Sequence, residues 1–312
     1  MKTWLLPLLC CPSCKSKLSL APSLQQGDDV VEGQLNCGGC SRTYQILRSV
    51  ARFVESDLYV KSFSAEWKQF WNTQLDNEQS HETREDFIGK TGTQPESLNG
   101  KCVLEAGCGM GRFCDIVSRV SGSKVVGFDL STSVESAERN VGSRSNVSIV
   151  QADIMSLPFA NETFDFVFSI GVLHHTKDPK QAFSKLVPTL KHGAKIAIWV
   201  YPKYNWVTFS DFYRHFTSHM PEWMLLPLVK LMIYINRIAK KAPKRVYKRL
   251  FKLMPVSIHS DYEHQLLDTF DWYSPKYQFK FDLDEVTKWF EQQGLQEIQS
   301  LPSHVSMTAN KP

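Results

Sequence analysis

Three acidic side chains stand directly after apolar segments, and a glycine turn follows the first. Glu105 precedes the turn Gly107-Cys108-Gly109-Met110-Gly111, Asp129 comes 22 residues after Gly107, and Asp153 ends the next apolar segment. A glycine turn lets the backbone approach a ligand, and the helix after it favours negative charge. Asp129 could accept hydrogen bonds from both hydroxyls of a ribose, and Asp153 from an adenine amino group. The set predicts a nucleotide-type cofactor.

Each of these signals alone has a simpler explanation. A lone glycine turn is weak evidence. Asp129 could cap the next helix, and Asp153 could stabilise a turn. Arg112 stands where a nicotinamide-binding Gly-x-Gly-x-x-Gly/Ala turn needs its last small residue. The three acids in register with the turn therefore carry the prediction, and the dinucleotide version is excluded.

Two Cys-x-x-Cys pairs form a second candidate site. Cys11 and Cys14 are separated by 22 residues from Cys37 and Cys40, and four thiolates can hold zinc tetrahedrally. A redox motif or disulfides are the alternatives, but a redox motif does not come in two copies. Four thiolate ligands leave no open coordination position, so we expect Zn²⁺ here to be structural.

These candidates must be positioned by alternating strands and helices, which is typical of a parallel sheet with helical crossovers. The pattern predicts strands near 101–105, 124–129, 147–151, 164–170 and 195–201. Helices are expected near 110–120, 132–140 and 179–190. After an interruption the alternation resumes, with a helix over 283–293 and strands near 295–301 and 305–309.

The chain divides into a zinc ribbon at 1–54, a linker and cofactor-covering helix at 55–100, and an α/β domain at 101–312. Phe63, Trp67, Phe70 and Trp71 mark the predicted helix of the linker. Residues 204–280 break the alternation, with aromatic and then basic residues and prolines. We expect them to form a mainly helical insertion that serves as a substrate lid.

The formal net charge of +4 does not by itself predict nucleic-acid binding. Eight of the basic residues, however, gather in 237–252 without an acid. This run is interpreted as a solvated helix face, a peripheral membrane contact or an RNA contact. No apolar run reaches the roughly 20 residues that span a bilayer. Free cysteines without a signal peptide predict a cytoplasmic protein.

At the cofactor segments the chain resembles the class I S-adenosylmethionine-dependent methyltransferases, closest to the branch that methylates small molecules. The resemblance covers roughly 98–201 together with the closing helix and strand pair, and its motifs are 103–113, 126–131, 151–153, 157–159 and 164–175. It implies a Rossmann-like seven-stranded sheet with helices on both faces, whose last strand is antiparallel and lies beside the fifth. Residues 1–54 resemble the small β zinc-ribbon module that precedes several bacterial methyltransferase domains.

The resemblance also implies a role for each matching residue. Glu105 and the turn backbone would hold the methionine end of S-adenosyl-L-methionine, and Asp129 would hold its ribose. The adenine would contact Leu130, Asp153 and Ile154, and Ile170 would line the wall where donor meets acceptor. The implied cofactor-binding residues are Glu105, Gly107, Cys108, Gly109, Gly111, Asp129, Leu130, Asp153, Ile154 and Ile170.

A catalytic base is needed only if the acceptor is a hydroxyl, a protonated amine or an acidic carbon. His174 and His175 are the candidates, and we expect His174 to face the cleft. Further candidates are Tyr201 and, in the insertion, Tyr204, Asp211, His215, Tyr262 and His264. Aromatic residues of the insertion either indicate an apolar or aromatic acceptor or pack the lid's own core; they are Phe209, Phe212, Tyr213, Phe216, Trp223 and Met224.

We therefore predict a methyltransferase that uses S-adenosyl-L-methionine. Its acceptor would be an N, O or C nucleophile of a small, apolar or aromatic metabolite of specialised metabolism. An RNA methyltransferase acting on ribosomal or transfer RNA is the alternative, although the Asn/Asp-Pro-Pro-Tyr motif of many base-amine methylators is absent after the fourth strand. A non-catalytic zinc-ribbon scaffold is a third interpretation. The sequence leaves the oligomeric state open.

Overall fold

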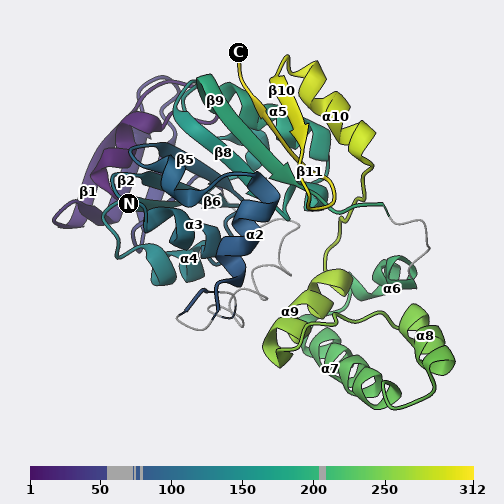
Figure 1. Cartoon of the computed structure of the whole chain (residues 1–312). Coiled ribbons are helices and arrows are strands. Elements are labelled where there is room, and N and C mark those ends of the chain that lie inside the picture. The colour runs from purple at the N-terminus through teal and green to yellow at the C-terminus, as the bar shows by residue number, and fades with distance from the viewer. Residues whose placement is uncertain (55–72, 74, 78–79, 204–208) are drawn as a thin grey trace.

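The computed structural model describes residues 1–54, 73, 75–77, 80–203 and 209–312. A single 11-stranded sheet runs through it in the order β1-β2-β3-β4-β7-β6-β5-β8-β9-β11-β10 (Figure 1). The strands are β1 (Leu18–Gln26), β2 (Asp29–Cys37), β3 (Thr43–Leu47), β4 (Val50–Arg52), β5 (Cys102–Ala106), β6 (Lys124–Asp129), β7 (Val147–Gln151), β8 (Phe164–Ile170), β9 (Leu190–Trp199), β10 (Gln296–Ser300) and β11 (Ser306–Asn310).

Seven of these strands, from β7 to β10 in the sheet order, form the predicted α/β sheet. Strands β7, β6, β5, β8 and β9 are parallel, and β11 is inserted antiparallel between β9 and β10. The predicted fold class is therefore confirmed, including the antiparallel last strand beside the fifth. The ranges of β6, β7 and β8 coincide with the predicted ones because each is rich in apolar residues, as expected of strands buried on both faces.

Helices cover both faces of this sheet. On one face α2 (Glu82–Thr91), α3 (Arg112–Ser118) and α4 (Val134–Val141) pack around Phe87, Phe113 and Phe168. On the other face, α5 (Pro179–Leu186) and α10 (Leu283–Gln292) bury Phe183 and Phe290. Short 3₁₀ segments are η1 (Thr3–Leu8), η2 (Pro95–Leu98), η3 (Ile154–Ser156), η4 (Leu173–His175) and η5 (Val187–Thr189).

The N-terminal module continues the large sheet. Its last strand β4 pairs in parallel with β7, with Ala51 opposite Val150. Its apolar residues Leu5, Leu35 and Ile46 belong to the same buried cluster as Phe128 of β6. Sequence analysis predicted a small β ribbon without indicating this pairing, because β4 is only three residues long and lacks a distinct pattern.

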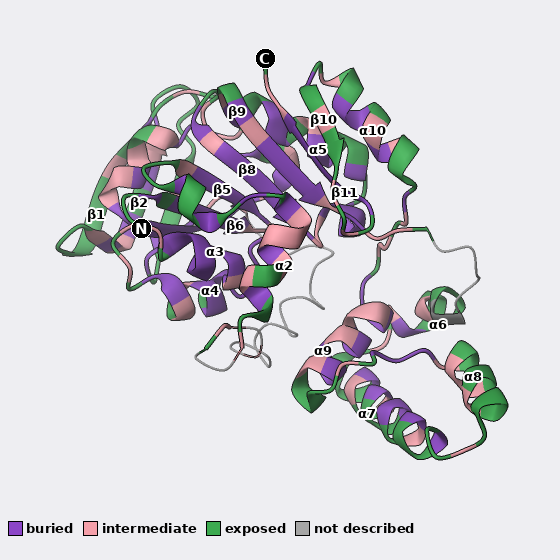
Figure 2. Cartoon of the chain, viewed as in Figure 1, coloured by how far each residue is buried: buried purple, intermediate pink, exposed green. Residues whose placement is uncertain are grey.

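The insertion after β9 forms a helical lobe with its own core (Figure 1). In its described part the helices are α6 (Phe209–Thr217), α7 (Glu222–Ala239), α8 (Lys244–Leu253) and α9 (Tyr262–Tyr273). Val229, Ile233, Leu266 and Phe270 are buried together, separately from the two clusters of the sheet. Figure 2 shows α8 largely exposed, and none of its residues is fully buried.

The linker at 55–100 was expected to contain one helix that covers the cofactor. The predicted linker helix marked by Phe63, Trp67, Phe70 and Trp71 lies outside the described residues. A helix that the sequence analysis missed, α2, follows it and packs on the sheet next to α3. In the part of the chain that the structure describes, no helix combines the length and the apolar character needed to cross a membrane.

Candidate functional site

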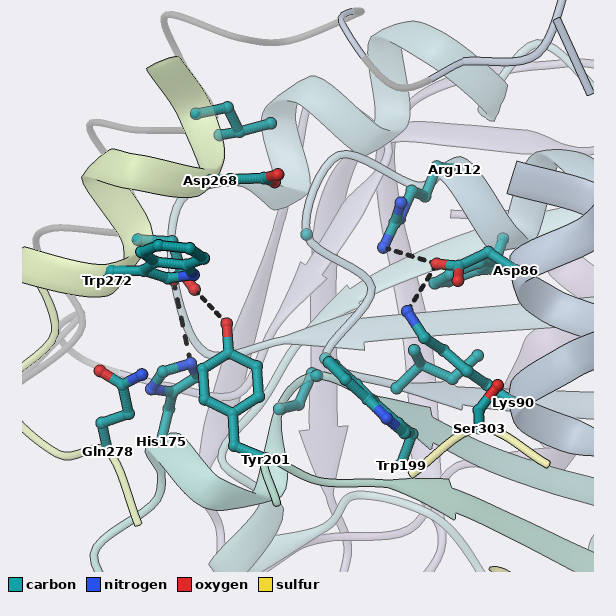
Figure 3. Close-up of a pocket in the computed structure, with 18 of the residues that line it drawn as sticks. Asp86, Lys90, Arg112, His175, Trp199, Tyr201, Asp268, Trp272, Gln278 and Ser303 are labelled. Carbon is teal, nitrogen blue, oxygen red and sulfur yellow. Dashed lines mark hydrogen bonds and ion pairs between the residues drawn. The ribbon is translucent and has the colours of Figure 1, made fainter. Parts of the chain in front are cut away.

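A cavity of about 1670 Å³ lies where the parallel strands end. Its inner wall comes from the segments after β5, β6, β7 and β8, and its outer wall from α8 and α9 of the helical lobe. Helix α2 closes one side. Figure 3 shows two opposite sides of the cavity. His175, Tyr201 and Trp272 lie on one side, and Asp86, Lys90 and Arg112 lie on the other. Open α/β sheets bind their ligands at this edge.

The glycine turn begins the inner wall directly after β5. Gly107 and Gly109 both have positive φ, at 79° and 50°. A Cβ atom added at Gly107 would lie 2.4 Å from the Val172 side chain, so glycine is required there. The turn leads into α3, whose N-cap is Gly111 with φ of 86°. Gly109 donates its backbone N–H to Asp129 Oδ2 at 3.0 Å, which ties the turn to the end of β6.

Glu105 is an acidic side chain that is almost completely buried. Only 2% of the residue is exposed, and its Oε2 has no hydrogen-bond partner among the described residues. Burial raises the pKa of Glu105 to about 8. A buried carboxylate oxygen without a partner is costly, and Glu105 lines the cavity. A cationic or hydrogen-bonding group bound there would satisfy it.

Asp129 and Asp153 line the cavity at the ends of neighbouring strands, but both also have local partners. Asp129 Oδ1 accepts from the Ser131 N–H at 2.8 Å and its hydroxyl at 2.7 Å. Asp153 Oδ1 accepts from the Met155 N–H at 2.9 Å and caps η3. Asp153 therefore has the local role considered for it, whereas Asp129 bonds to Ser131 and does not cap α4, whose N-cap is Ser133. Each carboxylate retains further acceptor positions, so ligand binding remains a prediction for both.

The structure brings together nine of the ten residues that the resemblance assigned to the cofactor. Gly111 is the exception, because it does not line the cavity and instead faces α4, with Ala137 3.3 Å from where its Cβ would lie. The nine that line the cavity are Glu105, Gly107, Cys108, Gly109, Asp129, Leu130, Asp153, Ile154 and Ile170. A buried acid with one unpartnered oxygen, beside the glycine turn, fits a ligand with a cationic amino-acid end and a nucleoside.

The prediction that His174 faces the cleft is wrong. His174 is completely buried and stacks on the Tyr201 ring with centroids 3.8 Å apart. Burial lowers its pKa well below the usual value. His175 lines the cavity instead. The two histidines occupy the short η4 segment. A pair of identical adjacent residues does not indicate which side chain the turn directs to the cavity.

His175 is held in one tautomer. Its Nδ1 lies 2.8 Å from the Tyr277 carbonyl oxygen, which can only accept, so Nδ1 carries the proton and Nε2 carries the lone pair. Nε2 lies 3.8 Å from Asp271 Oδ1 on α9. Tyr201 donates its hydroxyl to the other oxygen of Asp271 at 2.6 Å. Burial lowers the pKa of the His175 imidazole, which favours its neutral form.

A second polar group at the cavity was missed because it depends on α2. Lys90 donates to Asp86 Oδ2 at 2.7 Å, and Arg112 Nη2 lies 3.7 Å from the same oxygen. The Lys90 ammonium also lies 4.1 Å from the centre of a Trp199 ring, a cation–π contact. Burial lowers the pKa of Lys90. An i, i+4 acid–base pair at 86 and 90 was the available signal.

The aromatic residues expected to contact the acceptor or fill the lid core mostly do neither. Phe212, Phe216 and Trp223 are exposed by 63%, 59% and 75%, and Met224 is also exposed. Tyr213 packs against the lobe core, whereas Tyr204 and the side chain of Phe209 lie outside the described residues. The aromatic residues that the lobe places in the cavity wall are Tyr247, Phe251 and Trp272.

The basic run contributes to the cavity through Lys248 and Lys252. Among the further base candidates, His264 lines the cavity, but Tyr262 and the exposed His215 do not. Asp211 is paired with Arg214 and Lys280.

The four cysteines of the N-terminal module converge at one point. Their sulfur atoms all lie within 4.8 Å of one another, with Cys14 and Cys37 3.4 Å apart and Cys11 and Cys40 3.6 Å apart. A tetrahedral zinc with Zn–S bonds of about 2.3 Å needs sulfur atoms roughly 3.8 Å apart. The cysteines are not joined by disulfides. The group fits a structural Zn²⁺, as predicted, and lies away from the cavity.

Two family models match the chain in agreement with this architecture. Residues 104–198 match a model described as a methyltransferase domain, and residues 2–48 match the model of Trm112p-like proteins. The chain therefore carries a methyltransferase domain, preceded by a Trm112p-like module.

Curated relatives match only part of this chain. O-methyltransferase resE of Aspergillus sclerotiorum is 29% identical over 133 residues, 41% of this chain and 50% of the relative. Phosphoethanolamine N-methyltransferase 1 of Zea mays is 31% identical over 124 residues, which are 39% of this chain and 24% of the relative. A tRNA U34 carboxymethyltransferase of Campylobacter curvus is 28% identical over 102 residues, 32% and 34%. The chain thus spans half or less of the length of these relatives.

Solved structures resemble the chain more weakly in sequence. A Haloferax volcanii complex of the Trm112 methyltransferase activator with a methyltransferase is 14% identical, with a TM-score of 0.47, and the match covers 83% of this chain and 99% of that one. A SAM-dependent methyltransferase from Aquifex aeolicus is 15% identical, with a TM-score of 0.40, and the match covers 72% and 90%.

Proposed function

We propose that this chain, with its methyltransferase domain and Trm112p-like module, is an S-adenosylmethionine-dependent methyltransferase acting on a small molecule. The buried Glu105 beside the glycine turn, whose Oε2 has no hydrogen-bond partner among the described residues, carries this proposal. A sulfonium methyl donor with an amino-acid end would give that carboxylate a cationic partner. Asp129 would accept from the ribose hydroxyls, and Asp153 would accept from the adenine amino group. Leu130, Ile154 and Ile170 would supply the apolar walls.

Bound S-adenosylmethionine supplies an activated methyl group for an in-line displacement. The protein then has to align the acceptor and exclude water. Trp199, Tyr201 and Trp272 line the cavity, which supports an acceptor with an apolar or aromatic part. The predicted apolar acceptor therefore rests on these residues instead of Phe212, Phe216 and Trp223.

We assign His175 as the general base for an O–H or N–H acceptor. The Tyr277 carbonyl fixes the proton on Nδ1, so the Nε2 lone pair can take the acceptor's proton as its oxygen or nitrogen gains the methyl group. Asp271 would stabilise the imidazolium that forms, because its Oδ1 lies 3.8 Å from Nε2. Tyr201 holds Asp271 by donating its hydroxyl to Oδ2. His174 has no such access, since it is buried beneath Tyr201.

Binding and transfer should be tested separately. Calorimetry with S-adenosylmethionine should give clear binding to the wild type and at least tenfold weaker binding to Asp129→Ala. Transfer of a labelled methyl group should then be measured on a low-molecular-mass extract and on bulk tRNA. Absence of cofactor binding would overturn the enzymatic proposal, whereas labelled tRNA with an unlabelled extract would replace the small molecule by RNA.

The base assignment has its own test once an acceptor fraction is labelled. His175→Ala should lower the transfer rate by about 10²–10⁴-fold while S-adenosylmethionine affinity stays unchanged. His215→Gln is the matched control, because His215 is an exposed histidine of the lobe. A His175→Ala rate equal to that of the wild type would mean that the acceptor needs no base from this residue.

A further inference from the structure

The outer face of α7 carries a row of exposed apolar side chains that the lobe core does not use. Trp223, Leu231, Tyr234 and Ile238 are exposed by 75%, 52%, 62% and 53%, and Pro227 is exposed between them. At about 100° per residue, these five positions fall within an arc of about 80° and extend over roughly 22 Å of helix. We call this row the α7 stripe.

The stripe is distinct from the face that folds the lobe. Leu225, Val229 and Ile233 are buried, and they form the lobe core with residues of α9. Figure 2 shows α7 with buried and exposed residues on different sides. A helix needs one apolar face to pack, and a second, exposed apolar row is typical of an interaction surface.

Basic residues lie along one edge of the stripe and beyond its C-terminal end. Lys230, Lys240 and Lys241 are exposed on α7 and at its end. Helix α8, which packs beside α7, adds further exposed cations, namely Lys244, Arg245, Lys248, Arg249 and Lys252. From 237 to 252 the chain contains no acid. The surface is therefore apolar and cationic together.

We propose that the α7 stripe and the basic residues around it dock on an anionic lipid bilayer, with α7 lying in the interface plane. Leu231, Ile238 and Trp223 would enter the boundary between headgroups and acyl chains, and the lysines would contact anionic headgroups. Trp and Tyr suit this depth because each has an apolar ring and a polar tip. The inference does not depend on methyl transfer.

Two other occupants fit the surface less well. RNA would engage the basic side chains through its phosphates but would leave Leu231 and Ile238 uncovered. A second copy of the chain, packed stripe against stripe, would bring two sets of lysines together, and like charges repel. Anionic lipid satisfies both the apolar and the cationic parts.

The same surface adjoins the cavity. Tyr247 and Phe251 of α8 belong to the cavity wall, while Arg245 and Arg249 of this helix are exposed. A docked lobe would therefore place one wall of the cavity close to the bilayer. This arrangement suits access by an amphiphilic molecule from the membrane.

Vesicle co-sedimentation of the full chain tests the proposal. We expect at least tenfold more protein on phosphatidylcholine vesicles containing 30% phosphatidylglycerol than on pure phosphatidylcholine. Leu231→Glu combined with Ile238→Glu should reduce this binding at least tenfold. Leu24→Glu is the matched control, because Leu24 is 48% exposed on β1, and it should bind as the wild type does. Lys240→Glu with Lys241→Glu should also bind more weakly.

Three results would overturn the proposal. The wild type could stay in the supernatant with both vesicle types, or the Leu231/Ile238 variant could sediment as the wild type does. Light scattering could also show a dimer that the Leu231/Ile238 variant dissociates, with vesicle binding absent; the stripe would then be an interface between copies. Filter binding to bulk tRNA that depends on Lys240 and Lys241, again without vesicle binding, would assign the surface to RNA. S-adenosylmethionine binding by each variant reports separately on the proposed enzyme.

Discussion

The N-terminal module and the helical lobe are both additions to the methyltransferase sheet, but they are attached in different ways. The module joins through strand pairing, with β4 beside β7, and shares one buried cluster with β6. The lobe has a separate core, and it meets the end of the sheet through side-chain contacts such as that of Tyr201 with Asp271. An addition that shares a core should unfold with its host, whereas one with its own core can unfold locally.

Loss of zinc should have the largest effect and should test the shared core. Cys37→Ser with Cys40→Ser removes two ligands of the predicted zinc site. Structural zinc sites contribute on the order of 10 kcal/mol to the free energy of folding. Since Leu35 and Ile46 are buried together with Phe128, we expect calorimetry to show a large fall in the unfolding temperature of the sheet. Cys102→Ser, which changes a thiol outside the zinc site, should shift it far less. An unchanged sheet transition in the zinc-site variant would mean that the module folds independently.

The pH dependence of the free energy of unfolding should reveal the cost of burying the Glu105 carboxylate at the end of β5. The pKa of Glu105 rises from 4.5 to about 8 on folding, so the folded state keeps a proton that the unfolded state loses. The free energy of unfolding should therefore fall as pH rises from about 4.5 to about 8, by as much as about 5 kcal/mol. Glu105→Gln should flatten this slope in urea titrations of the protein without cofactor. Equal slopes for both proteins would contradict the shift.

A cavity created in the lobe core should destabilise the lobe helices without destabilising the sheet. Phe270→Ala removes a side chain that is 2% exposed and should cost about 3 kcal/mol. Hydrogen exchange should accelerate in α7 and α9 while β5 and β8 keep their protection. Phe183→Ala, in the core of the sheet, provides the comparison, because it should reduce protection across the strands. Uniform loss of protection in Phe270→Ala would show that lobe and sheet unfold as one unit.

The smallest effect should come from the seam between module and sheet. Arg52 of β4 donates to Gln151 Oε1 at 2.8 Å and lies 3.3 Å from Glu135. Arg52→Met should cost about 1–2 kcal/mol by chemical denaturation, because a partly buried charged hydrogen bond is lost. Arg48→Met should cost almost nothing, because the Arg48 side chain is 75% exposed. Similar values for the two variants would show that the seam depends on apolar packing alone.

The sequence predicted best where the chain alternates regularly. Strands β6, β7 and β8 were placed correctly because each is a short segment rich in Val, Ile and Phe, followed by polar or glycine residues. The four zinc ligands were identified from spacing, which is itself a geometric constraint. Glu105 and Asp129 were placed at the cavity because parallel strands end at one edge of a sheet.

The failures occurred where long-range packing decides. The choice between His174 and His175 depends on which ring Tyr201 covers, and Tyr201 comes from another strand end. The aromatic residues of the lobe could have faced the cavity, the core or solvent, and the helix arrangement left Phe212, Phe216 and Trp223 exposed. Helix α2 was missed because its polar sequence has little amphipathic pattern, although Phe87 is fully buried.

The pairing of β4 with β7 also determines how the module and the methyltransferase domain stay together. Because one chain carries both, their ratio is always one to one, and dilution cannot separate them. Their association is an intramolecular event governed by an effective concentration. Changes in expression level or protein concentration should therefore leave the seam intact, whereas cutting the chain between β4 and α2 would make it depend on concentration.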